Sequence, residues 1–143
     1  MMKNFPLIVF MFLLIGGSCK SKSERIAQWE EYFETNVLNR NFTVSLAQDN
    51  GTDLTGNYTG YTFVLLKTDF YHGPLQAIKG GSMYTGTWSC NEDYSKLVIT
   101  LSNPPSEFGF LSRSWKFTSK KFPTLKLAPW GSSEALVLYM FRQ

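Results

Sequence analysis

From Phe42 to the C-terminus, apolar and polar side chains alternate along short segments that are rich in β-branched and aromatic residues. Alternation of this kind places successive side chains on opposite faces of an extended chain, so it predicts half-buried β-strands. Turns rich in Gly, Pro, Asn and Asp separate the segments. We expect eight strands, at residues 42–48, 61–67, 74–79, 83–90, 96–102, 111–119, 124–128 and 135–142.

The connections between these segments are short, which favours antiparallel pairing of strands that follow one another in the sequence. In each segment one set of side chains is apolar and the other is polar, so one face of the sheet should contact water. A long sheet with one wet face removes its unpaired edges by closing into a barrel. The sequence therefore predicts a mainly β chain that forms a single antiparallel eight-stranded barrel. A two-sheet β-sandwich remains the alternative, because strand number alone does not separate the two.

Residues 24–38 have a different periodicity, which separates an apolar face from faces that carry most of the charged residues. Apolar residues recur there at helical spacing, namely Ile26, Trp29, Phe33 and Val37. Ser23 is a suitable residue to cap the N-terminus of such a helix. We therefore expect one N-terminal amphipathic helix over residues 24–38, within a single domain over residues 24–143.

The first residues have the layout of an export signal. Lys3 precedes an apolar run over residues 5–15, and small residues follow up to position 18. The run is about half of the roughly 20 residues that a membrane-spanning helix needs. A small residue directly before Cys19 suits lipoprotein processing, so we expect a lipoprotein signal peptide over residues 1–18 and lipid on Cys19. Ordinary secretion remains the alternative, because the same small residues also suit a common signal peptidase.

Lipid on Cys19 would make the membrane a partner and would place the protein in the cell envelope. Residues 19–23 would then form a short polar tether. No acidic cluster follows Cys19 in the sequence, so the periplasmic side of the outer membrane is the preferred location.

Charge and cysteine content limit the classes of function. Removal of residues 1–18 takes away Lys3 and leaves 13 of the 14 Lys and Arg residues against 11 Asp and Glu. These charges are scattered, whereas nucleic-acid binding needs a clustered basic surface, so no nucleic-acid partner is expected. Lipid on Cys19 would leave Cys90 without a partner, and we interpret Cys90 as a small buried strand residue.

Residues that could carry out catalysis are few. His72 is the only histidine and lies in a predicted turn, so no nucleophile–His–acid triad is indicated. The acidic residues after the helix fall in predicted turns, where solvated carboxylates are usual. The sequence therefore predicts no catalytic residue, no metal site, no cofactor and no enzymatic activity.

Aromatic residues are abundant, and they could either line a pocket or fill the core. An eight-stranded barrel just fills its interior with side chains or holds one small ligand. Three rings on predicted strands are candidates for a ligand site, with core filling as the alternative: Tyr61, Trp88 and Trp115. Three rings in or beside predicted loops are candidates for an interaction loop: Phe108, Phe110 and Trp130.

Four motifs follow one another along the chain: Gly-Tyr-x-Phe at residues 60–63, Gly-Thr-Trp at residues 86–88, a strand with Trp115, and a last hydrophobic strand over residues 135–142. In this order they resemble the small lipocalin-like lipoproteins of Gram-negative bacteria. The resemblance covers about residues 42–142 and implies a lipocalin-like barrel and a cell-envelope address. It implies no activity, because the group has no agreed function and a fold does not define one.

Two hypotheses of function follow, and a hydrolase that uses His72 or an acidic cluster is a weak third. The first is a non-enzymatic envelope lipoprotein whose barrel binds a small apolar or amphipathic ligand. The second is a protein-interaction or inhibitor module that is anchored at the membrane, contacts an envelope protein and has no small-molecule ligand.

Overall fold

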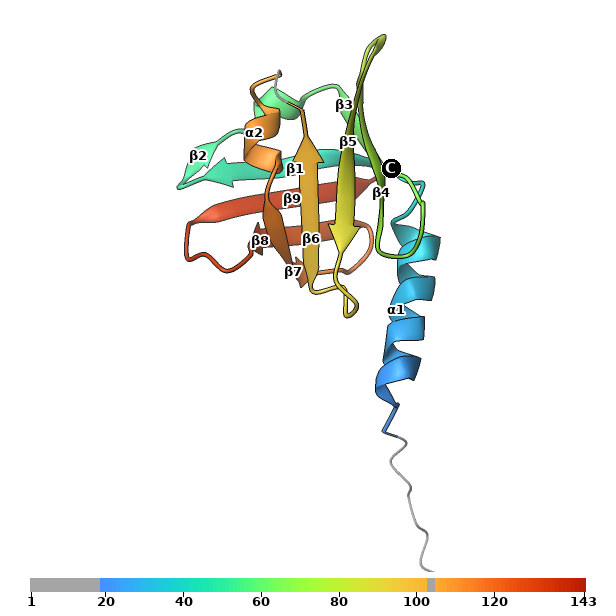
Figure 1. Ribbon diagram of the computed structural model, residues 1–143. Coiled ribbons are helices and arrows are strands. Elements are labelled where there is room, and N and C mark those ends of the chain that lie inside the picture. Colours follow the sequence, from blue (N-terminus) through green and yellow to red (C-terminus); the bar gives the residue numbers. More distant parts are fainter. Residues whose placement is uncertain (1–18, 103–104) are drawn as a thin grey trace, which may run out of the picture.

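The computed structural model describes residues 19–102 and 105–143. The expected signal peptide, residues 1–18, lies outside the described residues. The described residues build one sheet of nine strands, and each strand is antiparallel to its neighbours (Figure 1). The strands are β1 (Asn41–Asp49), β2 (Thr52–Asp53), β3 (Tyr61–Leu65), β4 (His72–Lys79), β5 (Ser82–Cys90), β6 (Lys96–Leu101), β7 (Ser114–Ser119), β8 (Thr124–Pro129) and β9 (Leu136–Arg142).

Pairing between β1 and β9 closes the sheet. β1 begins beside β3, where Phe42 pairs with Phe63, and continues beside β9 as far as the pair of Asp49 with Leu136. Strands β1 and β3–β9 therefore form a closed eight-stranded barrel, and the short β2 extends the sheet beside the end of β1. The predicted barrel is confirmed. The sandwich alternative is wrong, because one continuous hydrogen-bonded sheet connects all the strands.

A bulge in β1 changes which of its side chains face the core. The register between β1 and β9 shifts between Val44 and Leu46. Because an inserted residue reverses the alternation beyond it, Ala47 is fully buried while Leu46 is only half-buried. Strict alternation along the strand expected at residues 42–48 would place Leu46 on the inward face with Phe42 and Val44, and the bulge makes that assignment wrong.

The strand expected over residues 111–119 is wrong over its first three residues. Phe108–Leu111 forms the short helix α2, and β7 begins only at Ser114. Ser112 breaks the extended chain, because its hydroxyl accepts a hydrogen bond from the backbone N–H of Leu101 at 2.9 Å. The two-residue β2 and the 3-10 helix η1 (Thr55–Tyr58) were not expected either, since both lack apolar alternation.

The inward side chains of the barrel form one apolar core. Among the described residues, no polar or charged side chain is fully buried. Along β5 to β9, the apolar residues that alternation places on the inward face are buried. They are Trp88, Leu97, Ile99, Leu101, Trp115, Phe117, Leu125, Leu127, Leu136, Leu138 and Met140.

Helix α1 (Lys22–Asn36) precedes the barrel. It begins two residues earlier than expected, because Ser21 rather than Ser23 caps it. The Ser21 hydroxyl accepts a hydrogen bond from the backbone N–H of Glu24 at 3.2 Å, and the Glu24 carboxylate accepts one from the N–H of Ser21 at 2.8 Å. The tether between Cys19 and the helix is therefore shorter than residues 19–23.

Helices α1 and α2 lie on opposite sides of the barrel (Figure 1). Phe33, the one fully buried residue of α1, packs its ring 4.1 Å from that of Tyr94 and 5.5 Å from that of Phe117. This contact lies at the end where β5 turns into β6. α2 and η1 cover the other end, where the ring of Phe108 meets that of Tyr61 at 5.4 Å.

Candidate functional site

The three rings proposed to bind a ligand are buried in the core. Trp88 and Trp115 are 1% and 0% exposed, and Tyr61 is 3% exposed. The indole N–H of Trp88 donates to the carbonyl of Leu66 at 2.7 Å, and that of Trp115 donates to the carbonyl of Leu111 at 2.9 Å. Both indoles therefore have their hydrogen bonds met inside the protein, as expected for rings that fill a core.

Five surface hollows of about 300 to 600 Å³ lie between described residues. Neither Tyr61 nor Trp115 lines any of them. Trp88 contributes to one, a hollow of about 500 Å³ beside Pro74 and Thr87 on β4 and β5. The three rings therefore do not share one of these hollows.

The rings expected in an interaction loop lie in two different settings. Phe108 and Phe110 belong to α2 and are 0% and 8% exposed, which corrects the expectation of an exposed aromatic loop. Their sequence lies between strands, but the helix turns both rings toward the end of the barrel, where Phe110 contacts Trp115 at 5.6 Å. Trp130 is 39% exposed, and the ammonium group of Lys96 lies 5.3 Å from the centre of its ring. Trp130 thus keeps an accessible surface.

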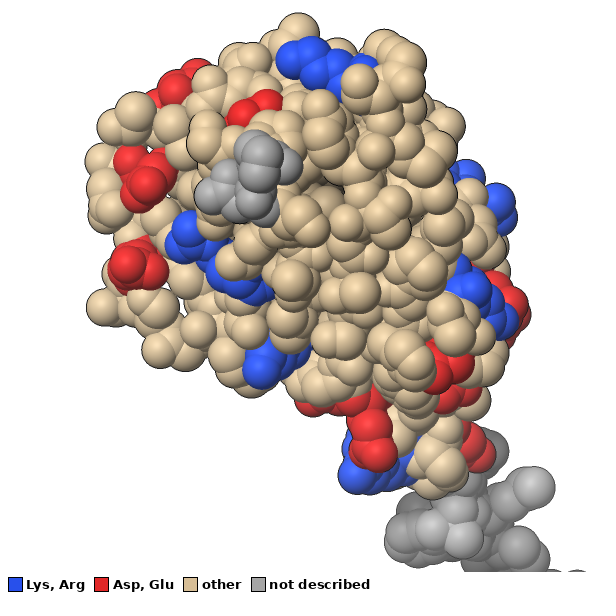
Figure 2. Space-filling model, turned by 45° about the horizontal axis from the view of Figure 1, so that its top comes forward, with Lys and Arg blue, Asp and Glu red and all other residues tan. Residues whose placement is uncertain are grey.

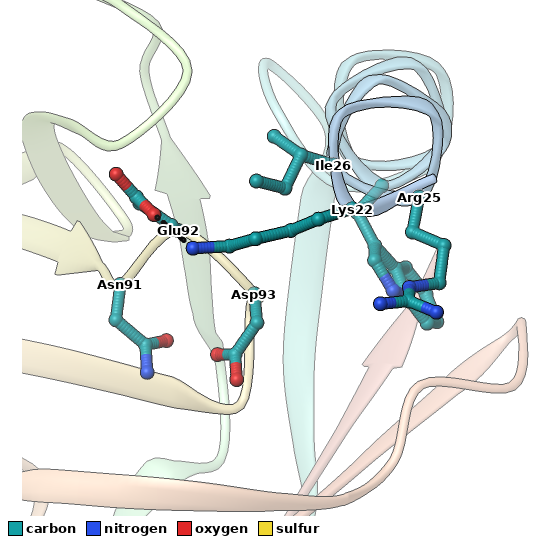
Figure 3. A pocket seen from close by; sticks show the side chains of 7 residues that line it. Lys22, Arg25, Ile26, Asn91, Glu92 and Asp93 are labelled. Atoms are coloured by element: carbon teal, nitrogen blue, oxygen red, sulfur yellow. Dashed lines mark ion pairs between the residues drawn. The ribbon is translucent and has the colours of Figure 1, made fainter. Parts of the chain in front are cut away.

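The largest of the five hollows, about 600 Å³, lies between the first half of α1 and the turn from β5 to β6 (Figure 3). We call it the α1 groove. Across its mouth, the Lys22 ammonium group reaches the Glu92 carboxylate at 3.7 Å. Its lining residues are Lys22, Arg25, Ile26, Trp29, Asn91, Glu92 and Asp93.

Hydrogen bonds hold the turn that forms one wall of the α1 groove. The Asn91 side-chain oxygen accepts bonds from the backbone N–H groups of Ser95 and Lys96 at 3.1 and 2.9 Å. The Asp93 carboxylate accepts from the Ser95 hydroxyl at 2.6 Å, and this bond lowers the pKa of Asp93 below its usual value. Tyr94, with a φ of 51°, places its ring in the core and donates to the carbonyl of Phe70 at 2.6 Å. The wall is therefore rigid.

A second hollow, about 380 Å³, shares Arg25 and Trp29 with the α1 groove. We call it the Trp29 hollow, and its lining residues are Lys20, Arg25, Gln28, Trp29 and Tyr32. The Tyr32 hydroxyl donates to the carbonyl of Lys120, and the Lys120 ammonium group lies 3.8 Å from the centre of the Trp29 ring. Burial lowers the pKa of Lys120. These contacts fix both rings of the hollow against the barrel.

Sequence reasoning missed both of these sites. The α1 groove depends on a turn about 65 residues away from α1 in the sequence, and long-range contacts of this kind leave no local pattern. Part of the Trp29 hollow could have been suspected, because Arg25, Trp29 and Tyr32 follow one another at helical spacings of four and three residues.

Ionisable groups elsewhere are engaged in local contacts. His72 Nδ1 lies 2.8 Å from the Asp69 carboxylate at the surface. Burial raises the pKa of the Cys90 thiol to about 12, so this thiol stays protonated at neutral pH. In residues 19–102 and 105–143, no group of three His, Cys, Asp or Glu is placed to hold a metal ion.

Charged side chains are mixed on the face of the molecule that Figure 2 shows. Lys and Arg lie among Asp and Glu there and do not gather into one basic area. At the α1 end, both signs occur side by side. This face therefore has no single charged area that would attract a partner of opposite charge.

Comparisons with family models, curated proteins and solved structures give no match for this chain. No helix in the described part of the chain combines the length and apolar character needed to cross a bilayer. Function must therefore be inferred from the sequence and from the surfaces described above.

Proposed function

We propose that the protein is a non-enzymatic lipoprotein of the cell envelope, anchored through Cys19, which acts by binding an envelope protein at its surface. Cys19 is exposed, and only Lys20 and Ser21 separate it from α1. The export-type sequence of residues 1–18 and the small residue before Cys19 support lipidation. The periplasmic side of the outer membrane remains the proposed location.

One observation favours a surface function over a ligand inside the barrel. Trp88 and Trp115, the largest inward side chains, are buried and hydrogen-bonded to backbone carbonyls. Binding of a small apolar molecule between them would require these rings to leave their partners, at the cost of unsatisfied indole donors. A protein partner would instead meet preformed surfaces, which include the α1 groove and the exposed ring of Trp130.

Binding of a small amphipathic ligand remains the second candidate. The Trp88 side of the barrel has an outer hollow of about 500 Å³ with Pro74 and Gly73 in its lining. Such a ligand would take this outer site, because concave and mostly apolar sites are the usual small-molecule sites. The resemblance to lipocalin-like lipoproteins supports either candidate, since it fixes no ligand.

Two measurements test the proposal. Incorporation of radioactive palmitate should disappear in Cys19→Ser and persist in Cys90→Ser, and unchanged labelling of Cys19→Ser would overturn the anchor. Crosslinking in intact envelopes should give a defined protein adduct that Trp130→Ala or Asn91→Ala weakens. A saturable tryptophan response to fatty acids with no protein adduct would favour the second candidate.

A further inference from the structure

The Trp29 hollow lies beside the residue that we propose to carry lipid. Lys20, the residue after Cys19, lines the hollow, and Ser21 is already fixed in the capping box of α1. A chain spans at most about 3.5 Å per extended residue and about 1.5 Å per helical residue, so Arg25 stays within roughly 15 Å of the acylated residue and Trp29 within roughly 20 Å. Any lipid on Cys19 would hold this hollow at the membrane surface.

The hollow has the chemistry of a phospholipid site. Two cationic side chains, those of Lys20 and Arg25, are combined with the rings of Trp29 and Tyr32. Guanidinium groups bind phosphate through paired hydrogen bonds, and Trp and Tyr side chains are enriched at the level of lipid headgroups. The Lys120 ammonium group, 3.8 Å from the centre of the Trp29 ring, adds positive charge beside this ring.

The acidic residues of α1 are engaged or lie outside this hollow. Glu24 accepts the capping bond from Ser21, Glu30 accepts from the hydroxyl of Tyr71, and Glu34 pairs with Lys67. Glu31 lines the adjacent hollow further along the helix. The α1 groove, by contrast, contains Glu92 and Asp93, which would repel a phosphate. An anionic headgroup would therefore bind in the Trp29 hollow, whose lining contains no acidic residue, and not in the α1 groove.

We propose that the Trp29 hollow binds an anionic phospholipid of the bilayer that holds Cys19, so that α1 docks on the membrane surface. The headgroup phosphate contacts Arg25 and Lys20, and the upper acyl chain lies against Trp29 and Tyr32. This inference rests on the proposed anchor, but it is testable without it. The core cluster extends from Phe33 to Met140, so a chain of residues 19–143 that carries Cys19→Ser keeps the whole fold.

Vesicle co-sedimentation of this soluble chain tests the proposal. We expect it to bind vesicles of phosphatidylcholine with phosphatidylglycerol and to bind vesicles of phosphatidylcholine alone several-fold more weakly. The double variant Lys20→Ala, Arg25→Ala should bind the anionic vesicles about thirtyfold more weakly. The matched control Lys116→Ala, Lys126→Ala removes the same charge from exposed positions on β7 and β8 and should stay within about twofold of the parent chain.

Fluorescence locates the contact. Brominated phosphatidylglycerol should quench part of the tryptophan emission of the parent chain and of Trp130→Phe, but not of Trp29→Phe. Equal loss of binding in both double variants, equal binding to both vesicle types, or quenching that persists in Trp29→Phe would overturn the proposal. Absence of binding to any vesicle would also overturn it, while palmitate labelling of the full chain would still decide separately whether Cys19 is acylated.

Discussion

The hydroxyl group of Tyr61 donates a hydrogen bond of 2.7 Å to Oε1 of Glu107. This bond connects the first residue of β3 to the residue that precedes α2, and the hydroxyl of Tyr58 donates to the backbone carbonyl of the same Glu107 at 2.7 Å. Burial, followed by the neighbouring carboxylate, raises the pKa of Tyr61 to about 12, and the same bond lowers the pKa of Glu107. Two phenol groups thus fasten α2 over the end of the barrel.

Tyr61→Phe removes one of these two donors, and we expect it to lower the free energy of unfolding by about 1–3 kcal/mol, as for hydrogen bonds to charged groups. Glu107→Gln keeps an acceptor and should lower it less. Urea denaturation measures both changes. Tyr139→Phe is the matched control, since its ring is half-buried on β9 under the Lys126 ammonium group at 5.0 Å. An equal loss in the control would show that the Tyr61–Glu107 bond does not stabilise this end.

Gly86 is required by the close approach of two strands. A Cβ atom at this position would lie 2.0 Å from the backbone oxygen of Thr100 on β6, and backbone cannot move away without disturbing the ladder. We expect Gly86→Ala to lower the free energy of unfolding by about 3 kcal/mol. Gly109→Ala on α2 meets open space and should change it by less than about 0.5 kcal/mol. Thermal unfolding of the two variants compares them directly, and similar melting temperatures would contradict this account.

Alkaline solution should destabilise the protein. The pKa values of Tyr61, Tyr71 and Cys90 are all raised to about 12. Their ordinary values are 10.0 for the two tyrosines and 9.0 for the cysteine. Burial is the main cause for Tyr61 and Cys90, and the hydrogen bond to Glu30 is the main cause for Tyr71. Between these limits the unfolded chain releases protons that the folded chain keeps, so the free energy of unfolding falls as pH rises from about 9 to about 12.

Urea midpoints measured across this range provide the test. Below about pH 8 these groups are almost fully protonated in both states and contribute almost no slope. The variant Cys90→Ala should remove the earliest part of the decline, because the ordinary pKa of a thiol is the lowest of the three. A midpoint that stays constant up to pH 12 would rule out the raised values.

Cys90 should be chemically inert in the folded protein. The thiolate is the reactive form, and burial holds the pKa of this thiol near 12. In a Cys19→Ser chain we expect Cys90 to react with a disulfide reagent on the order of a hundredfold more slowly when folded than when unfolded in urea. A Cys90→Ala chain of residues 19–143, made without lipid so that the exposed Cys19 thiol is free, should react rapidly without denaturant. Because the Cys90 side chain is partly exposed, rapid reaction of the folded chain would contradict the raised pKa of its thiol.

Strand content could be predicted from the sequence because period-two alternation is a local signal. All eight barrel strands were expected within a few residues of their observed limits. The bulge between Val44 and Leu46 was not, since an inserted residue is imposed by pairing with β9 and has no marker in the sequence. The cap at Ser21 was displaced for a related reason, because two serines near the start of α1 both satisfy the preference and the position of Glu24 decides between them.

The aromatic residues were harder to assign than the strands. The number of aromatic residues does not distinguish a ligand pocket from a filled core, because both are lined by the same side chains. Phe108 and Phe110 are buried only because Ser112 and the tyrosine bonds to Glu107 fold their segment over the barrel end. The two hollows beside α1 depend on contacts between α1 and residues 91–93 or Lys120, which no pattern within either segment specifies.

The seam between β1 and β9 makes the barrel depend on the completeness of the chain. Before the last seven-residue strand is available, β1 can pair only through Asn41 and Phe42 with β3 and through its far end with β2. Synthesis delivers the N-terminal strand first, so closure of the barrel has to wait for the last residues of the chain. A truncated chain that ends before Leu136 would leave two unpaired strand edges, on β1 and on β8. Unpaired edges of this kind pair with strands of other chains.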